Sequence, residues 1–325
     1  MSLRQCIVNS RAWRDGRVTD DQVSPDEFKQ SLREHDLVWV DLLGPQEGDL
    51  IELATVLGLA GTAVDDILAP LERPKVTKHG DSLFFTVYAT TFDEAGHLVT
   101  QRISAIQFGS ALITIRLDDS FPMAAVAEHW EENPQLLRFG VGALVHGLLD
   151  HVVDTHFDTI QGLDDRLEEL EDQLFLERQS HGVFARTAYD LRKALVSLRR
   201  VVLPMREVVN ALIRHRQDGP ELAHWYDDLY DHVLRASEWT DSLRDLVTTM
   251  FETNLALQDS RLNLVMKKLA AWAAIIAVPT AITGWFGQNL PYPGFAETSG
   301  LWMSVASIIV CSGILFVLFK RLDWL

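Results

Sequence analysis

Cysteine and positive charge are both scarce in this sequence. The 325 residues include only two cysteines, Cys6 and Cys311, near opposite ends of the chain. This excludes a disulfide framework and a cysteine-rich zinc site. Lys and Arg total 29 against 46 for Asp and Glu, a net charge of −17. We therefore expect cations as partners and no nucleic acid, because an acidic surface repels phosphate.

The motifs of common enzymes are also missing. The sequence has no Gly-rich phosphate loop, no nucleophile motif and no His-Glu zinc-protease pattern. We expect no enzymatic activity and no prosthetic group.

Charged residues are absent from a long stretch near the C-terminus. No Asp, Glu, Lys or Arg occurs between Lys268 and Glu297, and a second uncharged run follows at 301–319. Each run approaches the ~20 residues that a helix needs to cross a bilayer. We predict transmembrane helices at 269–289 and 301–319, an outer loop at 290–300 and contact with membrane lipid.

The basic residues around these runs predict the orientation. Lys267 and Lys268 precede the first run, Lys320 and Arg321 follow the second, and the loop between them has no Lys or Arg. The positive-inside rule then places both chain termini, including the tail 320–325, in the cytosol. The first residues lack the apolar core of a signal peptide. We expect a multi-pass protein of an inner or plasma membrane.

Residues 1–138 are predicted to form a cytosolic α/β domain. Asp15-Gly16 is a hairpin signal between two short strands. Ser24-Pro25 is typical of a helix start, and that helix is expected to reach His35. Further expected strands are 37–42, 82–91 and 102–116, and further expected helices are 45–57 and 62–71.

Residues 139–268 are predicted to form long stalk helices. Leu163, Leu167, Leu170 and Leu174 alternate at spacings of three and four residues, as in a coiled-coil seam. A second helix is expected at 183–215, with a kink at Pro204. From Glu221 no Pro or Gly occurs before Pro279, so the third helix is predicted to continue into the membrane.

The end of the first span carries an unusual polar pair. Gln288 and Asn289 follow Gly287 at the expected membrane edge, and an Asn carboxamide oxygen can accept hydrogen bonds from the water shell of a hard cation. Two spans per chain cannot enclose a pore. A transport function therefore requires an oligomer.

At these residues the sequence resembles the CorA family of divalent-cation channels and its ZntB-type relatives. Gly287-Gln288-Asn289 is similar to the family's Gly-Met-Asn hallmark. Further resemblance lies in segments that cover nearly the whole chain: Trp39-Val40-Asp41-Leu42, Asp65-Asp66-Ile67-Leu68, Arg73-Pro74-Lys75-Val76, Tyr230-Asp231-His232 and Arg261 to Lys267.

The resemblance implies a funnel-shaped homopentamer with an α/β cytosolic domain, long stalk helices and two C-terminal spans. It further implies a selectivity filter at Gly287, Gln288 and Asn289. Met266 and Leu269 would form apolar rings that gate by dewetting. The implied pore-facing residues are Asn263, Met266, Leu269, Ala277 and Thr280.

A regulatory metal site is also implied by the resemblance. Asp228 matches a stalk aspartate that binds Mg²⁺ between subunits, and Asp66 matches its partner on the α/β domain. Asp231 and Glu252 would add to this site. A divalent ion that bridges such carboxylates removes their repulsion and would lock the subunits closed.

The identity of the ion stays open at the sequence level. Gln288 replaces the hallmark Met, and some ZntB-type relatives are thought to move Zn²⁺ with protons. His151, Asp154 and His156 are the nearest approach to a zinc cluster, but their spacing does not put all three on one helical face. We expect Mg²⁺ as substrate and regulator, with Co²⁺ or Ni²⁺ as surrogates. The alternatives are a proton-coupled Zn²⁺ transporter and a membrane-anchored interaction protein.

Overall fold

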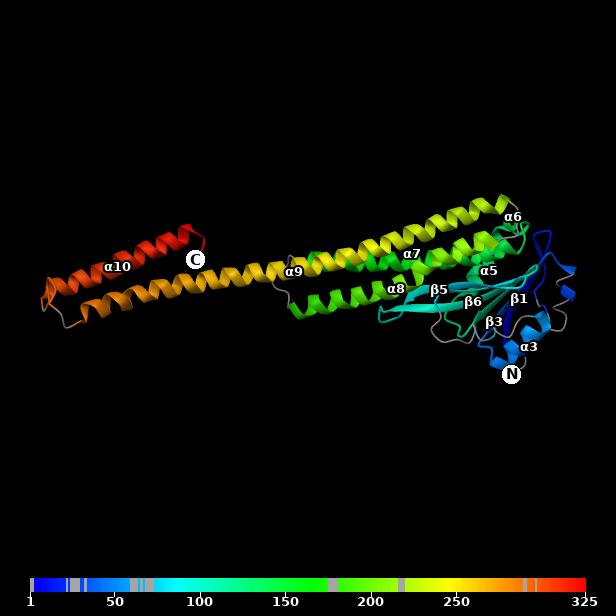
Figure 1. The fold of residues 1–325 in the computed structure, drawn as a ribbon, viewed down its shortest axis with the longest axis horizontal. Coiled ribbons are helices and arrows are strands. Elements are labelled where there is room, and N and C mark those ends of the chain that lie inside the picture. The colour runs from blue at the N-terminus through cyan, green and yellow to red at the C-terminus, as the bar shows by residue number, and fades with distance from the viewer. Residues whose placement is uncertain are drawn as a thin grey trace. The chain divides into compact units, whose positions relative to one another are not determined.

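The computed structural model describes residues 3–21, 23, 30–31, 34–58, 64, 67, 73–174, 181–215, 220–288, 291–295 and 297–325. It divides into two compact units, Met1–Thr248 and Thr249–Leu325. The N-terminal elements are α1 Leu3–Cys6, β1 Ile7–Arg14, β2 Arg17–Asp20, β3 Leu37–Leu43, α3 Glu47–Leu57, β4 Lys75–His79, β5 Ser82–Phe92, β6 Leu98–Phe108, β7 Ala111–Arg116, α5 Met123–Glu132 and α6 Pro134–Leu137. The long helices are α7 Val141–Leu174, α8 His181–His215, α9 Ala223–Phe286 and α10 Thr298–Arg321, with a 3₁₀ turn at Pro220–Leu222 (Figure 1).

The strands form one seven-stranded sheet in the order β2-β1-β3-β7-β6-β5-β4. β3 and β7 pair in parallel, whereas the other adjacent strands of this sheet pair antiparallel. The predicted hairpin is confirmed, because Asp15 and Gly16 connect β1 to β2 with φ of 52° and 73°. Two successive left-handed residues are what a type I′ turn requires. Cys6 lies at the end of α1, directly before β1.

The strand predicted at 102–116 is wrong as a single element. It contains the end of β6 and all of β7, joined by a turn at Gly109, whose φ is 56°. Both flanking segments are rich in β-branched residues, so their composition does not reveal the turn. The helix expected from Ser24 to His35 and the one at 62–71 fall mostly outside the described residues.

Alternate residues of β3 enter two different hydrophobic cores. Leu37 and Trp39 belong to the core shared with α5, α6, α7, α8 and the start of α9. Val38, Val40 and Leu42 belong to the core shared with α3. This division follows from the two-residue period of a strand, and it places helices on both faces of the sheet.

The three long helices agree with the predicted stalk helices. The seam residues Ile160, Leu163, Leu167, Leu170 and Leu174 are all buried. α8 contains Pro204 and α9 contains Pro279 inside the helix, so neither proline ends its helix. α5 and α6 were not expected from the sequence.

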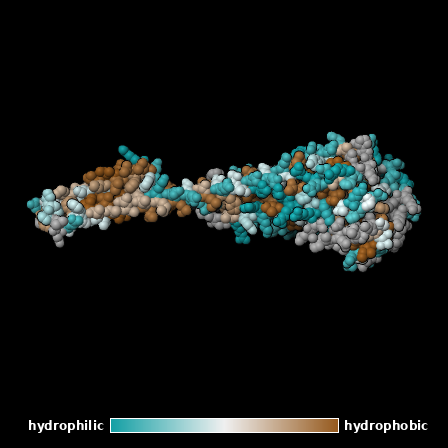
Figure 2. Space-filling model, viewed as in Figure 1, coloured by the Kyte–Doolittle hydropathy of each residue, from teal (hydrophilic) through white to brown (hydrophobic). Residues whose placement is uncertain are grey.

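Among the described residues, the two helices that are long and apolar enough to cross a membrane are α9 and α10. They carry the two predicted spans. Figure 2 shows apolar side chains gathered on the surface of α10 and of the C-terminal part of α9.

Candidate functional site

The residues expected to face a pore lie on one face of α9. Asn263, Met266, Leu269, Ala277 and Thr280 are all exposed in the single chain. Their spacings are multiples or sums of three and four residues, which bring helical side chains to the same side. Met266 and Leu269 are 63% and 66% exposed. Large apolar side chains this exposed need a neighbouring helix or lipid to cover them.

Threonine hydroxyl groups donate to backbone carbonyl oxygens near Pro279. Proline has no N–H, so it cannot donate to the carbonyl four residues earlier in the helix. Thr283 Oγ1 donates to the carbonyl oxygens of Pro279 at 2.8 Å and Thr280 at 3.2 Å, and Thr280 Oγ1 donates to that of Ile276 at 3.4 Å. Because the Thr280 hydroxyl donates its proton within the helix, its oxygen keeps lone pairs that can accept further hydrogen bonds.

The predicted filter begins where α9 ends. The Gly287 N–H donates to Thr283 O at 2.9 Å and the Gln288 N–H to Trp285 O at 3.3 Å, which closes the last turn. Both residues are exposed. Asn289 lies outside the described residues.

An aromatic cluster follows in the loop between α9 and α10. Tyr292 Oη donates to the carbonyl oxygen of Phe286 at 3.2 Å, a group that α9 leaves unpaired at its end. The Tyr292 ring meets those of Phe286 and Phe295 edge to face, at centroid distances of 5.1 and 5.4 Å. The sequence predicted an outer loop here but not this contact, for which the signal was the aromatic content of the segment.

Three carboxylates of the predicted sensor are exposed on α9. Asp228 and Asp231 are exposed on α9, where the other side of the helix buries Leu229 and Val233. His232 Nε2 lies 3.8 Å from Asp228 Oδ2. Glu252 is exposed on the part of α9 that belongs to the second unit, and Asp66 lies outside the described residues.

Oxygen ligands of this kind suit Mg²⁺ chemically. In the part of the chain that the structure describes, however, no three His, Cys, Asp or Glu side chains are grouped to hold a metal ion. A metal site at Asp228 would therefore need further ligands, either from another chain or from residues outside the described ranges.

The histidines weighed as zinc ligands have other surroundings. His156 is 1% exposed, and its Nε2 donates to Tyr88 O at 2.7 Å. Burial lowers the pKa of His156 from 6.5 to about 4. Burial also lowers the pKa of His151, whose ring meets Phe121. His232 packs edge to face on Phe157.

A buried ion pair, which sequence reasoning missed, lies at the end of the parallel strands. Arg116 Nη2 donates to Asp41 Oδ2 at 2.6 Å, and both side chains are at most 3% exposed. Burial disfavours the charged guanidinium, but the hydrogen bond and charge of Asp41 hold the pKa of Arg116 above its ordinary value. Asp41 also accepts a hydrogen bond from Thr114 at 2.7 Å. The pair joins β3 to β7, and we assign it a structural role.

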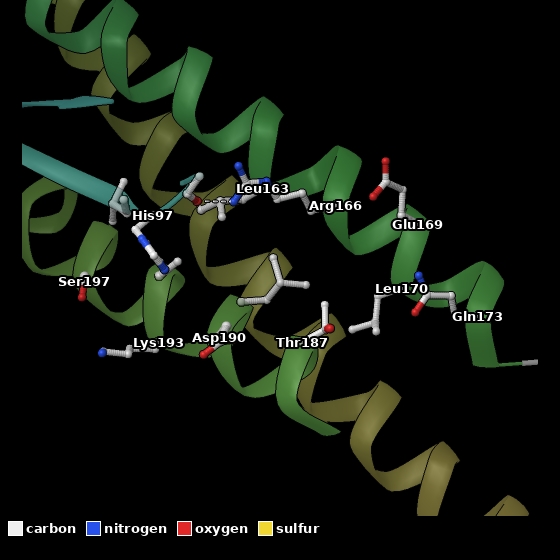
Figure 3. Close-up of a pocket in the computed structure, with 14 residues that line it drawn as sticks. His97, Leu163, Arg166, Glu169, Leu170, Gln173, Thr187, Asp190, Lys193 and Ser197 are labelled. Carbon is white, nitrogen blue, oxygen red and sulfur yellow. Dashed lines mark hydrogen bonds between the residues drawn. The ribbon is translucent and has the colours of Figure 1, made fainter. Parts of the chain in front are cut away.

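A cavity of about 520 Å³ lies between α7, α8 and the turn from β5 to β6 (Figure 3). Arg166 crosses one side of it and donates to the carbonyl oxygen of Gly96. Its guanidinium carbon lies 4.3 Å from the centre of the Phe92 ring. Charges of both signs line the cavity, and it includes none of the predicted pore or sensor residues.

Comparison with known proteins identifies the family. Residues 34–321 match the family described as CorA-like Mg²⁺ transporter protein. The cobalt/magnesium transport protein CorA of Thermotoga maritima is 28% identical over 296 residues, covering 88% of this chain and 83% of its own. That of Methanocaldococcus jannaschii is 26% identical over 321 residues, covering 96% and 98%.

The fold agrees with this assignment. The complete structure of the CorA magnesium transporter from Methanocaldococcus jannaschii superposes with a TM-score of 0.78 at 24% identity, covering 98% of each chain. The predicted class, an α/β domain with long helices and two C-terminal apolar helices, is confirmed. The chain belongs to the CorA-like Mg²⁺ transporter family and is a CorA-like divalent-cation transporter.

Proposed function

We propose that the chain assembles as a homopentamer that conducts Mg²⁺ into the cytosol, with Co²⁺ and Ni²⁺ as surrogate ions. The named relatives transport cobalt and magnesium. Mg²⁺ gives up its water reluctantly, so passage as a hydrated or partly hydrated ion fits the polar residues of this chain.

The exposed face of α9 from Asn263 to Thr280 is the observation that carries this proposal. One chain offers one such row of residues, and its two spans cannot surround a pore. Several copies around an axis would turn each residue of the face into a ring. Met266 and Leu269 would form the apolar gate, while Gly287, Gln288 and Asn289 would form the filter.

Regulation would use carboxylates of neighbouring copies. Asp228 is exposed and available to a second chain. In the proposed sensor it shares a Mg²⁺ ion with Asp66 of the next subunit, and Asp231 and Glu252 strengthen the site. Loss of cytosolic Mg²⁺ restores repulsion between the carboxylates, loosens the subunits and favours the open gate.

The membrane orientation is part of the proposal. Basic side chains lie before the first span and after the second, which favours cytosolic chain termini in an inner or plasma membrane.

Flux into proteoliposomes of the purified protein tests the proposal. Mg²⁺ and Zn²⁺ are supplied separately, each with and without a pH gradient. We expect Mg²⁺ entry that ignores the gradient and stops when Mg²⁺ is loaded inside. Zn²⁺ entry that requires the gradient would instead establish the proton-coupled alternative and make Gln288 the first residue to mutate. No flux of any divalent ion would favour a membrane-anchored interaction protein.

Asn289→Ala tests the filter. Removal of the carboxamide takes away the group proposed to bind the water shell of the ion, so Mg²⁺ uptake is expected to fall to background while the oligomer still forms. Uptake at the wild-type rate would exclude Asn289 from the filter. The mass of the variant in detergent, measured by light scattering, monitors assembly.

Asp228→Lys tests the sensor. A lysine ammonium at this position replaces the charge of the bridging ion, so the channel is expected to stay closed after Mg²⁺ is removed. Asp227→Lys, a change at the exposed neighbouring position on α9, is the matched control. An unchanged dependence of flux on internal Mg²⁺ in Asp228→Lys would remove this residue from the sensor.

A further inference from the structure

The charge of α8 is opposite to that of the whole chain. Seven Arg or Lys residues and two acidic residues lie in α8, although the chain carries −17. The C-terminal part of α7, from Asp154 to Leu174, holds eight acidic residues and one arginine. Each helix therefore carries a strong local charge, and the two signs differ.

The exposed positions of α8 form a basic stripe with apolar side chains at its centre. Tyr189, Lys193, Val196 and Arg200 follow at spacings of four, three and four residues, so they lie on one face of the helix. Tyr189 is 61% exposed and Val196 is 36% exposed. Arg186 is also exposed and extends the face. We call these five residues the basic stripe.

The exposed positions of α7 form an acidic stripe with the same period. Its members recur at spacings of three, four or seven residues and span roughly 27 Å along the helix. All are exposed, and we call them the acidic stripe: Asp154, Asp158, Asp165, Glu168 and Asp172.

The two stripes do not neutralise each other inside the chain. Within the described ranges, no ion pair joins a member of the basic stripe to an acidic residue. Arg199, on a different side of α8, binds Asp241 at 2.6 Å. Asp165 accepts a side-chain hydrogen bond from Gln161 on its own helix, at 2.8 Å.

We propose that the acidic stripe of one copy docks on the basic stripe of the next copy. A chain that carries two complementary but different faces binds its copies head to tail, and such a contact closes into a ring when the rotation allows it. The inference rests on the proposed oligomer and assigns one of its contacts. Charge complementarity favours a second copy as the occupant, because each stripe finds its counterpart on the same chain at the same period.

The contact combines attraction with burial. Tyr189 and Val196 supply apolar area between the cationic side chains, while the Lys and Arg heads reach carboxylates across the interface. Two chains with a charge of −17 repel each other overall. The attraction between the acidic stripe and the basic stripe therefore favours this docking orientation over others.

Disulfide cross-linking between copies tests the contact directly. Gln161→Cys, between acidic-stripe positions, is placed on one tagged chain and Val196→Cys on a second, both in a full-length Cys311→Ser background. Only a contact between copies can then join the two tags. We expect a cross-linked dimer at a yield at least about tenfold above that of the control pair Gln161→Cys and Ile51→Cys, in which the second cysteine is on α3.

Charge reversal supplies the second test. All the changes are at exposed positions, so the buried side of each helix is unaltered. One chain carries Asp158→Lys with Asp165→Lys, and the other Lys193→Glu with Arg200→Glu. In cross-linking between copies of the same variant, like charges now face each other, and the yield is expected to fall about tenfold. When the two variants are mixed, opposite charges face each other again and the yield recovers. Arg17→Glu with Lys78→Glu, both outside the stripes, is expected to leave the yield unchanged.

The outcomes separate this inference from the proposed function. A wild-type chain that forms pentamers by light scattering, but cross-links no better than the control pair, overturns the docking surface and leaves the channel proposal standing. Recovery within a single chain that carries all four changes, without recovery in the mixture, would assign the stripes to a contact inside the chain and also overturn the inference. A monomeric wild-type chain contradicts the pentamer itself.

Discussion

Single residues decide how the α/β unit tolerates buried polar groups. Arg116 and Asp41 are both buried, and Arg116 also donates to Asp119 Oδ1 and to Phe121 O, each at 2.9 Å. A buried pair with further hydrogen bonds offsets part of its desolvation cost, whereas the loss of one partner costs about 3–5 kcal/mol. His156 shows the other solution, because it is buried without a charge.

His156 predicts an acid-sensitive fold. Its pKa lies at about 4 in the folded chain and near 6.5 when solvated, so the unfolded chain binds the proton more readily. Stability is therefore expected to fall as the pH drops from about 6.5 to 4, by on the order of 3 kcal/mol from this residue. His156→Gln, which keeps a donor for Tyr88 O, should flatten this part of the pH profile.

The measurement is the thermal unfolding midpoint of the full-length chain in detergent, followed from pH 7 to pH 4. His97→Gln, a change at an exposed histidine, is the control and should retain the wild-type slope. An identical slope in His156→Gln would show that this side chain contributes no proton linkage.

At the scale of elements, glycine fixes how closely α7 approaches its neighbours. A Cβ at Gly147 would lie 2.6 Å from Nε1 of the buried Trp130, and one at Gly162 would lie 2.7 Å from the Phe92 ring. Trp130 in turn packs against Trp39, with ring centres 5.0 Å apart. α7 therefore approaches α5 closely near its start, at Gly147, and β5 closely further along, at Gly162, because these two positions lack side chains.

Gly147→Ala is expected to destabilise the chain although alanine is the better helix former. Overpacking costs about 1–3 kcal/mol and exceeds the gain of about 1 kcal/mol in helix propensity. Gly48→Ala in α3, where no neighbour lies within 4 Å, should instead be neutral or stabilising. Opposite shifts of the thermal midpoint in the two variants are expected. A rise with Gly147→Ala would mean that Trp130 moves aside at little cost.

At the scale of the whole molecule, the exposed apolar surface of the second unit requires partners. α10 and the membrane-side part of α9 expose large side chains such as Ile276, Leu301 and Ile309, each at least 64% exposed. Family membership explains this surface, since a membrane transporter covers it with lipid and with other helices.

The proposed gate belongs to this scale because it exists only as a ring. Leu269→Asn would place a polar group in the apolar constriction. Water would then stay in the constriction, and ions could continue to pass through it. Mg²⁺ flux into proteoliposomes is then expected to persist when Mg²⁺ is loaded inside. Leu264→Asn, on a different side of α9, is the control and should still close. Normal closure in Leu269→Asn would exclude this residue from the gate.

Much of the architecture was predictable from local pattern. The hairpin at Asp15-Gly16 and the buried seam of α7 were predicted from turn chemistry and periodicity, and both are confirmed. The turn at Gly109 was missed because the strands on both sides share one composition. The Asp41–Arg116 pair was missed because its partners are 75 residues apart, and nothing in the sequence indicates that β3 and β7 are neighbours.

The sequence by itself determined the class of the protein and the two apolar helices, and its resemblance to the CorA family supplied the residues proposed for the pore. Charge gaps, helical periods and motifs are local patterns, so they can be identified without knowledge of the fold. Only the tertiary structure decided which groups are buried, which histidine is neutral and which helix faces remain exposed. Burial and exposure depend on segments far apart in the chain, and these meet only when the chain is folded.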